Sequence, residues 1–390
     1  MTLSCTCSPH PVVNVDLGSL ARNGSEPKRK MCANAVQDAC RSHGCFHLRL
    51  SVPHDHPYPL HNLQGDLCSN IESLFDEDMV QCAELNPDGG LVETSYLVTS
   101  SRRSATYRGR TSESGAGAAE QPEPKQSWEL RRCHAAKDSD GGDRTKVVGE
   151  RLQRVEGWTV GMHQAAELVV QLLGIDPNTI LQNGPCGCSD MSSSEDMCCM
   201  DLMRAFRYDA LSSEQYRASH PGSSSHSDWG CLTIVWQDTS GGLQTYCHEC
   251  DKWSDVSASL DDDMPDNTIA LFVHVGDFLS LATGGEYPSP RHRVLCPLRK
   301  ETGSSKESRC SLVYFAYPPL GVSLEEAAIK LNKIKLPHAG DFLHYDRYSL
   351  LQNQSALSSD SSAHKAVYER MRKVPFEEAI KEKWGQVQRK

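Results

Sequence analysis

Residues 225–238 read SHSDWGCLTIVWQD, in which two candidate metal ligands stand directly before an apolar, β-branched run. Such a run is typical of a buried β-strand. Residues i and i+2 of an extended segment project from the same face, so His226 and Asp228 can reach one ion from one strand end. The stretch therefore predicts a core strand with half of a metal site beside it.

The His-x-Asp pattern by itself is weak evidence. The chain has 16 histidines, and the pattern occurs again at His344 and Asp346. An isolated pair of this kind is more often a hydrogen-bonded surface pair than a pair of ligands. The setting separates the two copies, because an apolar strand follows Asp228 and none follows Asp346.

A third ligand is predicted downstream. Residues 268–281 read TIALFVHVGDFLSL, which predicts a strand, a Gly-Asp turn and a second strand. The next extended piece, RHRV at 291–294, is expected to place His292 opposite the first pair. Two histidines and one carboxylate leave open positions on an iron ion, which oxygen chemistry requires. The sequence thus predicts an iron site formed by His226, Asp228 and His292.

An anion site is predicted on a later strand. Residues 309–317 read RCSLVYFAY, an alternating pattern that puts Arg309 and Ser311 on one face. An arginine fork can bind a carboxylate through two parallel hydrogen bonds, and a neighbouring hydroxyl adds a donor. A surface salt bridge is the other interpretation of Arg309. The anion site is favoured because an arginine within an apolar strand is costly unless it meets an anion.

Several blocks, in this order along the chain, resemble the iron(II)/2-oxoglutarate-dependent oxygenases of the isopenicillin N synthase-like group. The matching blocks are His226-x-Asp228 with its strand, Gly242-Leu243-Gln244, Val275-Gly276-Asp277, His292-Arg293-Val294 and Arg309-x-Ser311. The segments PVVNVDL at 11–17 and KWGQVQR at 383–389 are similar to the two ends of that group. The resemblance covers most of the chain and is weakest in the middle.

The resemblance implies a mostly β fold with flanking helices, built on a double-stranded β-helix (jelly-roll) core. It also implies iron(II) as cofactor and 2-oxoglutarate as cosubstrate, with Arg309 and Ser311 holding the far carboxylate. Tyr208, on the expected strand 202–208, takes the position of a tyrosine that contacts the cosubstrate carboxylate in the group. Phe206 departs from many plant-type members, which have asparagine there.

The implied activity is that of a dioxygenase, an oxidoreductase that uses O2 to oxidise a small molecule and releases succinate and carbon dioxide. Hydroxylation is the default outcome, with desaturation or ring closure as alternatives. No catalytic side chain beyond the iron ligands is expected. Phe315 and Trp229 are candidates for the substrate pocket, although aromatic packing explains them equally well, and Tyr107 and Arg108 are further candidates.

Two other functions stay open from the sequence. In the first, the chain is an iron oxidase like isopenicillin N synthase, in which Arg309 and Ser311 hold a substrate carboxylate and no 2-oxoglutarate is used. In the second, it is a non-catalytic scaffold with structural zinc. Cysteines with zinc-like spacing are Cys186, Cys188, Cys198, Cys199, Cys247 and Cys250. A hairpin turn is the stronger interpretation of residues 247–250.

Composition limits the remaining possibilities. A net charge of −11 argues against a nucleic-acid-binding surface, which needs concentrated Lys and Arg. Residues 1–10 lack a basic start followed by an apolar run, and no apolar stretch approaches membrane-spanning length. We therefore expect a cytoplasmic protein without a membrane span. In that compartment the 17 cysteines are expected to be thiols. The sequence indicates no oligomeric state.

The chain divides into three expected regions. Residues 8–197 form an N-terminal oxygenase region, with a short strand, helices over about 28–41 and 158–173, and polar loops between them. Residues 198–322 form the jelly-roll core that binds iron and 2-oxoglutarate. Residues 323–390 form a mostly helical tail.

Overall fold

The computed structural model describes most of the chain. The described residues are 10–20, 26–52, 67–75, 91–92, 96–101, 125–132, 146–182, 201–213, 221–258, 267–299, 308–331, 348–350 and 368–381. Within them, no helix combines the length and the apolar character that crossing a membrane requires.

Eight strands form the core as two facing layers. The strands of the larger layer are β6 (Asp201–Asp209), β8 (Leu232–Gln237), β11 (Thr268–Val275) and β13 (Ser308–Ala316). The strands of the smaller layer are β7 (Ser223–His226), β9 (Leu243–Cys247), β10 (Lys252–Asp255) and β12 (His292–Val294). The spatial orders are β11-β8-β13-β6 and β10-β9-β12-β7. Most consecutive strands change layer, which is the jelly-roll arrangement and confirms the expected core.

The larger layer extends on both sides with strands from the N-terminal part. On one side β1 (Val12–Asp16) lies parallel to β2 (Cys45–Ser51), which pairs with β11. On the other side β6 is followed by β5 (Lys125–Arg132), β4 (Tyr96–Ser101) and β3 (Leu91–Val92), giving a nine-stranded sheet. Pairing of β5 with β6 crosses the expected boundary near residue 197. The bounds of the three regions stay predictions.

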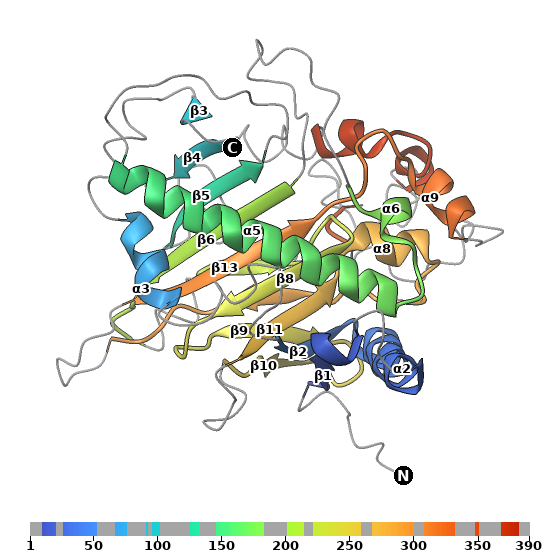
Figure 1. Ribbon diagram of the computed structural model, residues 1–390, viewed down its shortest axis with the longest axis horizontal. Coiled ribbons are helices and arrows are strands. Elements are labelled where there is room, and N and C mark those ends of the chain that lie inside the picture. Colours follow the sequence, from blue (N-terminus) through green and yellow to red (C-terminus); the bar gives the residue numbers. More distant parts are fainter. Residues whose placement is uncertain are drawn as a thin grey trace.

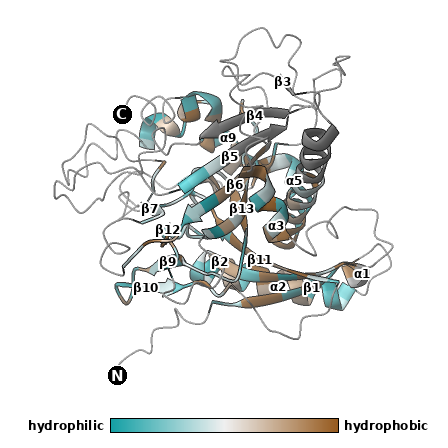
Figure 2. Ribbon diagram, turned by 90° about the vertical axis from the view of Figure 1, so that its left-hand side faces the viewer, coloured by the Kyte–Doolittle hydropathy of each residue, from teal (hydrophilic) through white to brown (hydrophobic). Residues whose placement is uncertain are grey.

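Four of the described helices pack on the larger sheet, namely α1 (Leu17–Leu20), α2 (Glu26–His43), α3 (Leu67–Glu72) and α5 (Lys146–Leu172), with a 3-10 turn at Ser73–Phe75. Helices α6 (Pro177–Ile180), α8 (Asp277–Ala282) and α9 (Leu324–Lys330) pack mainly on other helices. The long helix α5 runs across β6, β13 and β8 (Figure 1). Figure 2 shows α5 and α3 on one side of the larger sheet and the smaller sheet on the other.

Both helices expected in the N-terminal region are present. In α2 the buried side chains Cys32, Val36, Ala39 and Cys40 recur every three to four residues, so one face packs on the core. The second helix is longer than expected and begins at Lys146. Strands β4 and β5 were not predicted, because their sequences lack the alternation of apolar and polar residues that marks a half-buried strand.

The predicted strand after Asp277 is wrong, because residues 277–282 form α8 instead. Gly276 occupies the N-cap, and the Asp277 carboxyl lies in the first turn, where the helix dipole favours a negative charge. All six side chains of α8 are buried. A short run that is buried all round has no periodicity that could separate a helix from a strand.

The protein has two apolar interiors. The larger cluster lies between the helices and the large sheet. The smaller cluster lies between the two layers of the jelly roll and includes Phe206, Tyr208, Leu243 and Val294. Strands of both layers therefore direct side chains into one enclosed space, and this space contains the site.

Candidate metal centre

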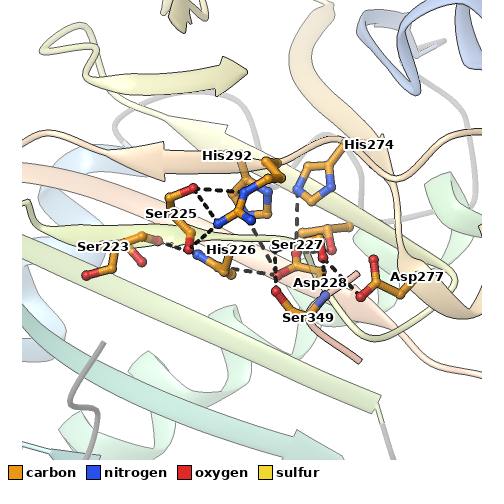
Figure 3. A network of polar contacts seen from close by, with 12 residues as sticks. Ser223, Ser225, His226, Ser227, Asp228, His274, Asp277, His292 and Ser349 are labelled. Carbon is orange, nitrogen blue, oxygen red and sulfur yellow. Dashed lines mark hydrogen bonds and ion pairs between the residues drawn. The ribbon is translucent and has the colours of Figure 1, made fainter. Parts of the chain in front are cut away.

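The three predicted iron ligands lie together. His226 is the last residue of β7, and its partner in the antiparallel register with β12 is His292. The Asp228 Oδ1 atom is 3.5 Å from His226 Nε2 and 3.7 Å from His292 Nε2. One ligand atom from each residue lies within 4.8 Å of the other two (Figure 3). The two histidines and the carboxylate thus converge on one point, as their spacing predicted.

Hydrogen bonds to the backbone orient both ligand rings. His226 Nδ1 is 2.6 Å from the Ser224 carbonyl oxygen, and His292 Nδ1 is 3.3 Å from the Pro290 carbonyl oxygen. Each Nδ1 therefore carries the proton that it donates to a carbonyl. The opposite nitrogen, Nε2, faces Asp228 in both rings and is the atom that would bind a metal.

The electrostatics of the triad fit a divalent cation. Burial alone would raise the pKa of Asp228, but His292, His226 and His274 together hold it well below its usual range. Burial and the neighbouring His226 lower the pKa of His292 well below the ordinary value. Burial opposes protonation of His226, yet the hydrogen bond to Asp228 and its charge raise the pKa of this ring. Asp228 is therefore anionic and His292 neutral, the protonation states that ligands need.

The second oxygen of Asp228 is held by the protein. The Thr233 hydroxyl donates a hydrogen bond to Asp228 Oδ2 at 2.5 Å. His274 Nε2 lies 3.5 Å from the same oxygen, and its ring centroid is 4.4 Å from that of His292. His274 is 1 % exposed, and its Nε2 has no hydrogen-bond partner within the described part of the chain. Asp228 is therefore turned so that Oδ1 alone faces the ligand site.

Hydrogen bonds fix Ser227, the residue between the first two ligands. The Ser227 hydroxyl donates to Asp277 Oδ2 at 3.0 Å, and the Leu350 amide donates to the same oxygen at 2.8 Å. The amides of Ser227 and Ser349 each donate to the other's hydroxyl oxygen, at 2.9 and 2.8 Å. Burial raises the pKa of Asp277 to about 7. Ser227 is thus tied to α8 and to residues 348–350 (Figure 3).

Four residues of this arrangement were missed from the sequence. They are Thr233, His274, Asp277 and Ser349. One signal was present, since His274 is a polar residue within the apolar run TIALFVHV. The other three have ordinary polar side chains whose role depends on contacts made only in the folded chain.

Arg309 is buried in a cage of neutral groups. Its Nε donates to the Gly241 carbonyl at 2.5 Å, Nη2 to Gln237 Oε1 at 2.9 Å, and Nη1 to the Ser311 hydroxyl oxygen at 3.1 Å. The guanidinium carbon lies 4.9 Å from the centre of the Tyr208 ring. Arg309, Ser311 and Tyr208 are therefore together, as predicted.

The charge of Arg309 has no carboxylate partner among the described residues. Its side chain is 1 % exposed, so the alternative of a surface salt bridge is wrong. A buried cation without an anion is costly, and this cost is relieved when an anionic ligand binds. The arrangement can therefore hold a carboxylate.

The metal ligands and the anion site lie toward opposite ends of one strand pair. On β8, Thr233 contacts Asp228 and Gln237 contacts Arg309, a separation of four residues or about 13 Å of strand. A ligand with two anionic ends can lie in the space between the layers. It would direct one end to the metal and the other to Arg309.

The substrate-pocket candidates have mixed outcomes. Phe315 faces Thr233 in the register of β13 with β8. Phe315 and Trp229 are half-buried and pack against the larger core cluster. Tyr107 and Arg108 lie outside the described residues.

The cysteine-based zinc site is not favoured. Cys247 is disulfide-bonded, so its sulfur is not a thiolate ligand, and the expectation of thiols throughout is wrong at this position. Spacing along the sequence does not reveal which cysteines approach each other in the fold. Residues 248–251 form the turn of the β9–β10 hairpin, as expected. The remaining cysteines of that predicted site, Cys186, Cys188, Cys198 and Cys199, lie outside the described residues.

Comparison with protein families matches residues 200–318 to the 2OG-Fe(II) oxygenase superfamily. A 2-oxoglutarate-dependent dioxygenase of Didymella fabae is 34% identical over 120 residues, which are 31% of each chain. Gibberellin 2-beta-dioxygenase 2 of Arabidopsis thaliana is 30% identical over 160 residues, 40% of this chain and 39% of that one. The chain thus spans about a third to two fifths of the length of these curated relatives.

A solved structure shares the fold over nearly the whole chain. This 2OG-Fe(II) oxygenase family protein of Caulobacter crescentus has a TM-score of 0.52 and 13% identity, covering 96% of this chain and 99% of that chain. At this identity the likeness concerns the fold. It agrees with the jelly roll and with the strands that flank it.

Proposed function

We propose that this chain, whose residues 200–318 belong to the 2OG-Fe(II) oxygenase superfamily, is an iron(II)- and 2-oxoglutarate-dependent dioxygenase. Its reaction would oxidise a small molecule, by hydroxylation in the default case, and would release succinate and carbon dioxide. The observation that carries the proposal is the buried, carboxylate-free Arg309 in the same interior as the ligand triad.

His226, Asp228 and His292 would hold the iron. The donor set fits, because two imidazole nitrogens and one carboxylate oxygen converge from two strand ends and leave the remaining directions open. Iron(II), when bound, supplies the activation of O2 that side chains cannot perform. Thr233 and His274 would keep the second oxygen of Asp228 away from the metal.

Arg309 and Ser311 would bind the distal carboxylate of 2-oxoglutarate. The Nη atoms of Arg309 point at neutral oxygens, so a bound carboxylate would gain charge-assisted hydrogen bonds that these oxygens do not give. The Ser311 hydroxyl accepts from Arg309, which leaves its own proton for the carboxylate. Tyr208, stacked on the guanidinium, would fix its plane. The apolar cluster between the layers would exclude water.

Two aromatic residues lie beside the ligand triad in sequence or in register. Phe315, opposite Thr233, and Trp229, next to Asp228, stay candidates for the substrate pocket, although both pack against the larger core cluster. Tyr107 and Arg108 stay predictions, as do the use of O2, the absence of nucleic-acid binding and the cytoplasmic location.

Calorimetry of 2-oxoglutarate binding tests the role of Arg309. The experiment uses protein loaded with Fe(II) without oxygen. Replacing Arg309 by Gln should weaken cosubstrate binding by roughly 30-fold or more, since a buried charge-assisted pair is worth about 2–5 kcal/mol. Iron affinity should not change. Arg207→Gln is the matched control, because Arg207 lies on the adjacent strand and pairs with Cys310 on the opposite face.

Product analysis separates the dioxygenase from the oxidase without 2-oxoglutarate. The proposed reaction consumes one O2 and one 2-oxoglutarate for each succinate, with no O2 uptake when 2-oxoglutarate is omitted. O2 uptake with a carboxylate substrate alone would show that Arg309 holds the substrate. The named relatives and the superfamily match favour the first outcome.

A further inference from the structure

A second group of metal-ligating side chains lies on the other face of β13. Cys310 stands between Arg309 and Ser311, and alternation along the strand directs its side chain away from theirs. Helix α3 packs on this face and contributes Cys68 and Glu72. One donor atom from each of Cys68, Glu72 and Cys310 lies within 4.8 Å of the other two. Nothing in the proposed reaction uses these residues.

The sulfur and carboxyl oxygen atoms of this group lie close to one another. Cys68 and Glu72 are four residues apart on α3, so they share one helix face, with Cys68 Sγ 3.7 Å from Glu72 Oε1. Cys310 Sγ lies 4.0 Å from the same oxygen. A fourth donor completes the set, because Asp238 Oδ2 is 3.8 Å from Cys68 Sγ. Asp238, directly after β8, also accepts the Cys310 amide at 2.7 Å.

These separations match the edges of a tetrahedral zinc site. With zinc–sulfur bonds of about 2.3 Å and zinc–oxygen bonds of about 2.1 Å, the sulfur–oxygen edge of a tetrahedron is about 3.6 Å. The three observed sulfur–oxygen distances are 3.7, 3.8 and 4.0 Å. The sulfur–oxygen separations are thus near that edge length, and Asp238, which lies outside the three donors that are mutually within 4.8 Å, would have to turn toward them to complete the set.

The local charge favours a cation at this point. The carboxyl oxygens of Glu72 and Asp238 lie 3.7 and 3.8 Å from Cys68 Sγ, so two acidic groups meet two cysteines here, and a dication would balance their charge and that of the thiolates. Arg207, the partner of Cys310 in the register of β6 with β13, packs its guanidinium over the Phe75 ring.

We propose that Cys68, Glu72, Cys310 and Asp238 form a second metal site, selective for a thiolate-binding dication such as zinc. The ligand set of two sulfurs and two carboxylates is closed, which is the character of a structural site. The metal would tie α3 to β13 and to the turn after β8. Since β13 carries Arg309 and Ser311, the metal would stabilise the anion-binding strand from its opposite face. This inference does not depend on the proposed reaction.

Cobalt(II) binding to the full-length, reduced apoprotein tests the proposal. Thiolate ligation of Co²⁺ gives an intense charge-transfer band in the near ultraviolet, whereas the histidine and carboxylate ligands of the first site give none. The wild type should bind two equivalents and show the band. A His226→Ala/Asp228→Ala double variant should bind one equivalent and keep the band.

The discriminating variants change half-buried residues of α3. Cys68→Ser should abolish the band and should bind one equivalent of Zn²⁺ fewer in equilibrium dialysis. Glu72→Gln should lower the affinity for that same equivalent. Cys250→Ser, a half-buried cysteine outside the group, should retain both. In the iron-site double variant, Zn²⁺ should raise the unfolding temperature, and Cys68→Ser should remove that rise.

Three results would overturn the proposal. They are a wild type without the band while its thiols titrate as reduced, a band that survives Cys68→Ser, and a single metal equivalent that disappears with His226 and Asp228. The first would show that Cys68 and Cys310 are hydrogen-bonded thiols and no more.

Discussion

At the scale of single residues, the two oxygens of Asp228 have different tasks. Oδ1 faces the two ligand histidines, and Oδ2 accepts the Thr233 hydroxyl beside His274. A carboxylate that is held on one side binds a metal through one oxygen only. The number of open positions on the metal thus depends on residues that never touch it.

Removing the Thr233 hydroxyl tests this arrangement. Thr233→Val keeps the shape of the side chain but frees Oδ2, so affinity for Fe(II) or Co(II) should fall roughly 10–100-fold. Titration with metal in the absence of oxygen measures this affinity. Thr283→Val is the control, because Thr283 is also buried but bonds to carbonyls of α8. Equal affinities in Thr233→Val and the wild type would show that the hydroxyl does not orient the ligand.

The metal ligands could be predicted from sequence, whereas their supports could not. His226 and Asp228 share a face because extended backbone has a period of two, which is a local property. Arg309 was found for the same reason. Asp277 and Ser349 act through contacts across 50 and 122 residues of chain, and no local pattern encodes those distances.

At the scale of elements, the turn between β8 and β9 connects the two layers and forms part of the Arg309 cage. Gly241 and Gly242 have φ of +70° and +91°, which side chains rarely adopt. The Gly241 carbonyl accepts the Arg309 Nε hydrogen bond. A Cβ on Gly242 would lie 2.3 Å from the Leu295 carbonyl oxygen, whereas a Cβ on Gly241 would meet nothing within 4 Å.

These two glycines form a matched pair. Gly241→Ala should cost only the backbone strain of its φ, about 1 kcal/mol of unfolding free energy. Gly242→Ala adds a clash with backbone, so it should cost more and weaken 2-oxoglutarate binding by moving the carbonyl that holds Arg309. Chemical denaturation and calorimetry on both variants measure the two effects. Equal losses of unfolding free energy and of 2-oxoglutarate affinity in the two variants would refute the role of close packing at Gly242.

Elements with a clear hydrophobic pattern were predicted well. The strands β6, β8, β11 and β13 and the helices α2 and α5 have regular apolar spacing, and all are present. Helix α8 was mistaken for a strand because it is short and buried on all sides, which leaves no helical periodicity in its sequence. Strand β5 pairs with β6 and β4 pairs with β5, and this pairing, rather than their own sequence, gives the two strands their conformation.

At the scale of the whole molecule, two buried histidines connect the N-terminal segment to the jelly roll. His10 Nε2 lies 2.6 Å from the Thr245 hydroxyl oxygen, and the rings of His10 and His47 both pack edge-on against Phe272. Burial lowers the pKa of each ring to about 4. Both are therefore neutral in the folded protein at pH 7.

This burial predicts a loss of stability in acid. Between the unfolded pKa of about 6.5 and the folded pKa of about 4, the unfolded chain binds more protons, so stability falls as pH falls through this window. At about 1.36 kcal/mol per pKa unit, each buried ring lowers the unfolding free energy by up to about 3 kcal/mol in acid. His47→Asn should flatten the dependence of the unfolding free energy between pH 6.5 and 4.

The control for this prediction is His248→Gln, because His248 is exposed in the β9–β10 turn. It should keep the pH dependence of the wild type. An identical slope in His47→Asn and the wild type would mean that other groups determine acid stability.

The central claim is that one interior holds iron through His226, Asp228 and His292 and 2-oxoglutarate through Arg309. The most direct measurement is the visible spectrum of the protein without oxygen, first with Fe(II) and then with 2-oxoglutarate. We predict that a charge-transfer band appears only after 2-oxoglutarate is added and that it is absent in Arg309→Gln at the same concentration. Bound iron without any band in the wild type would contradict the claim.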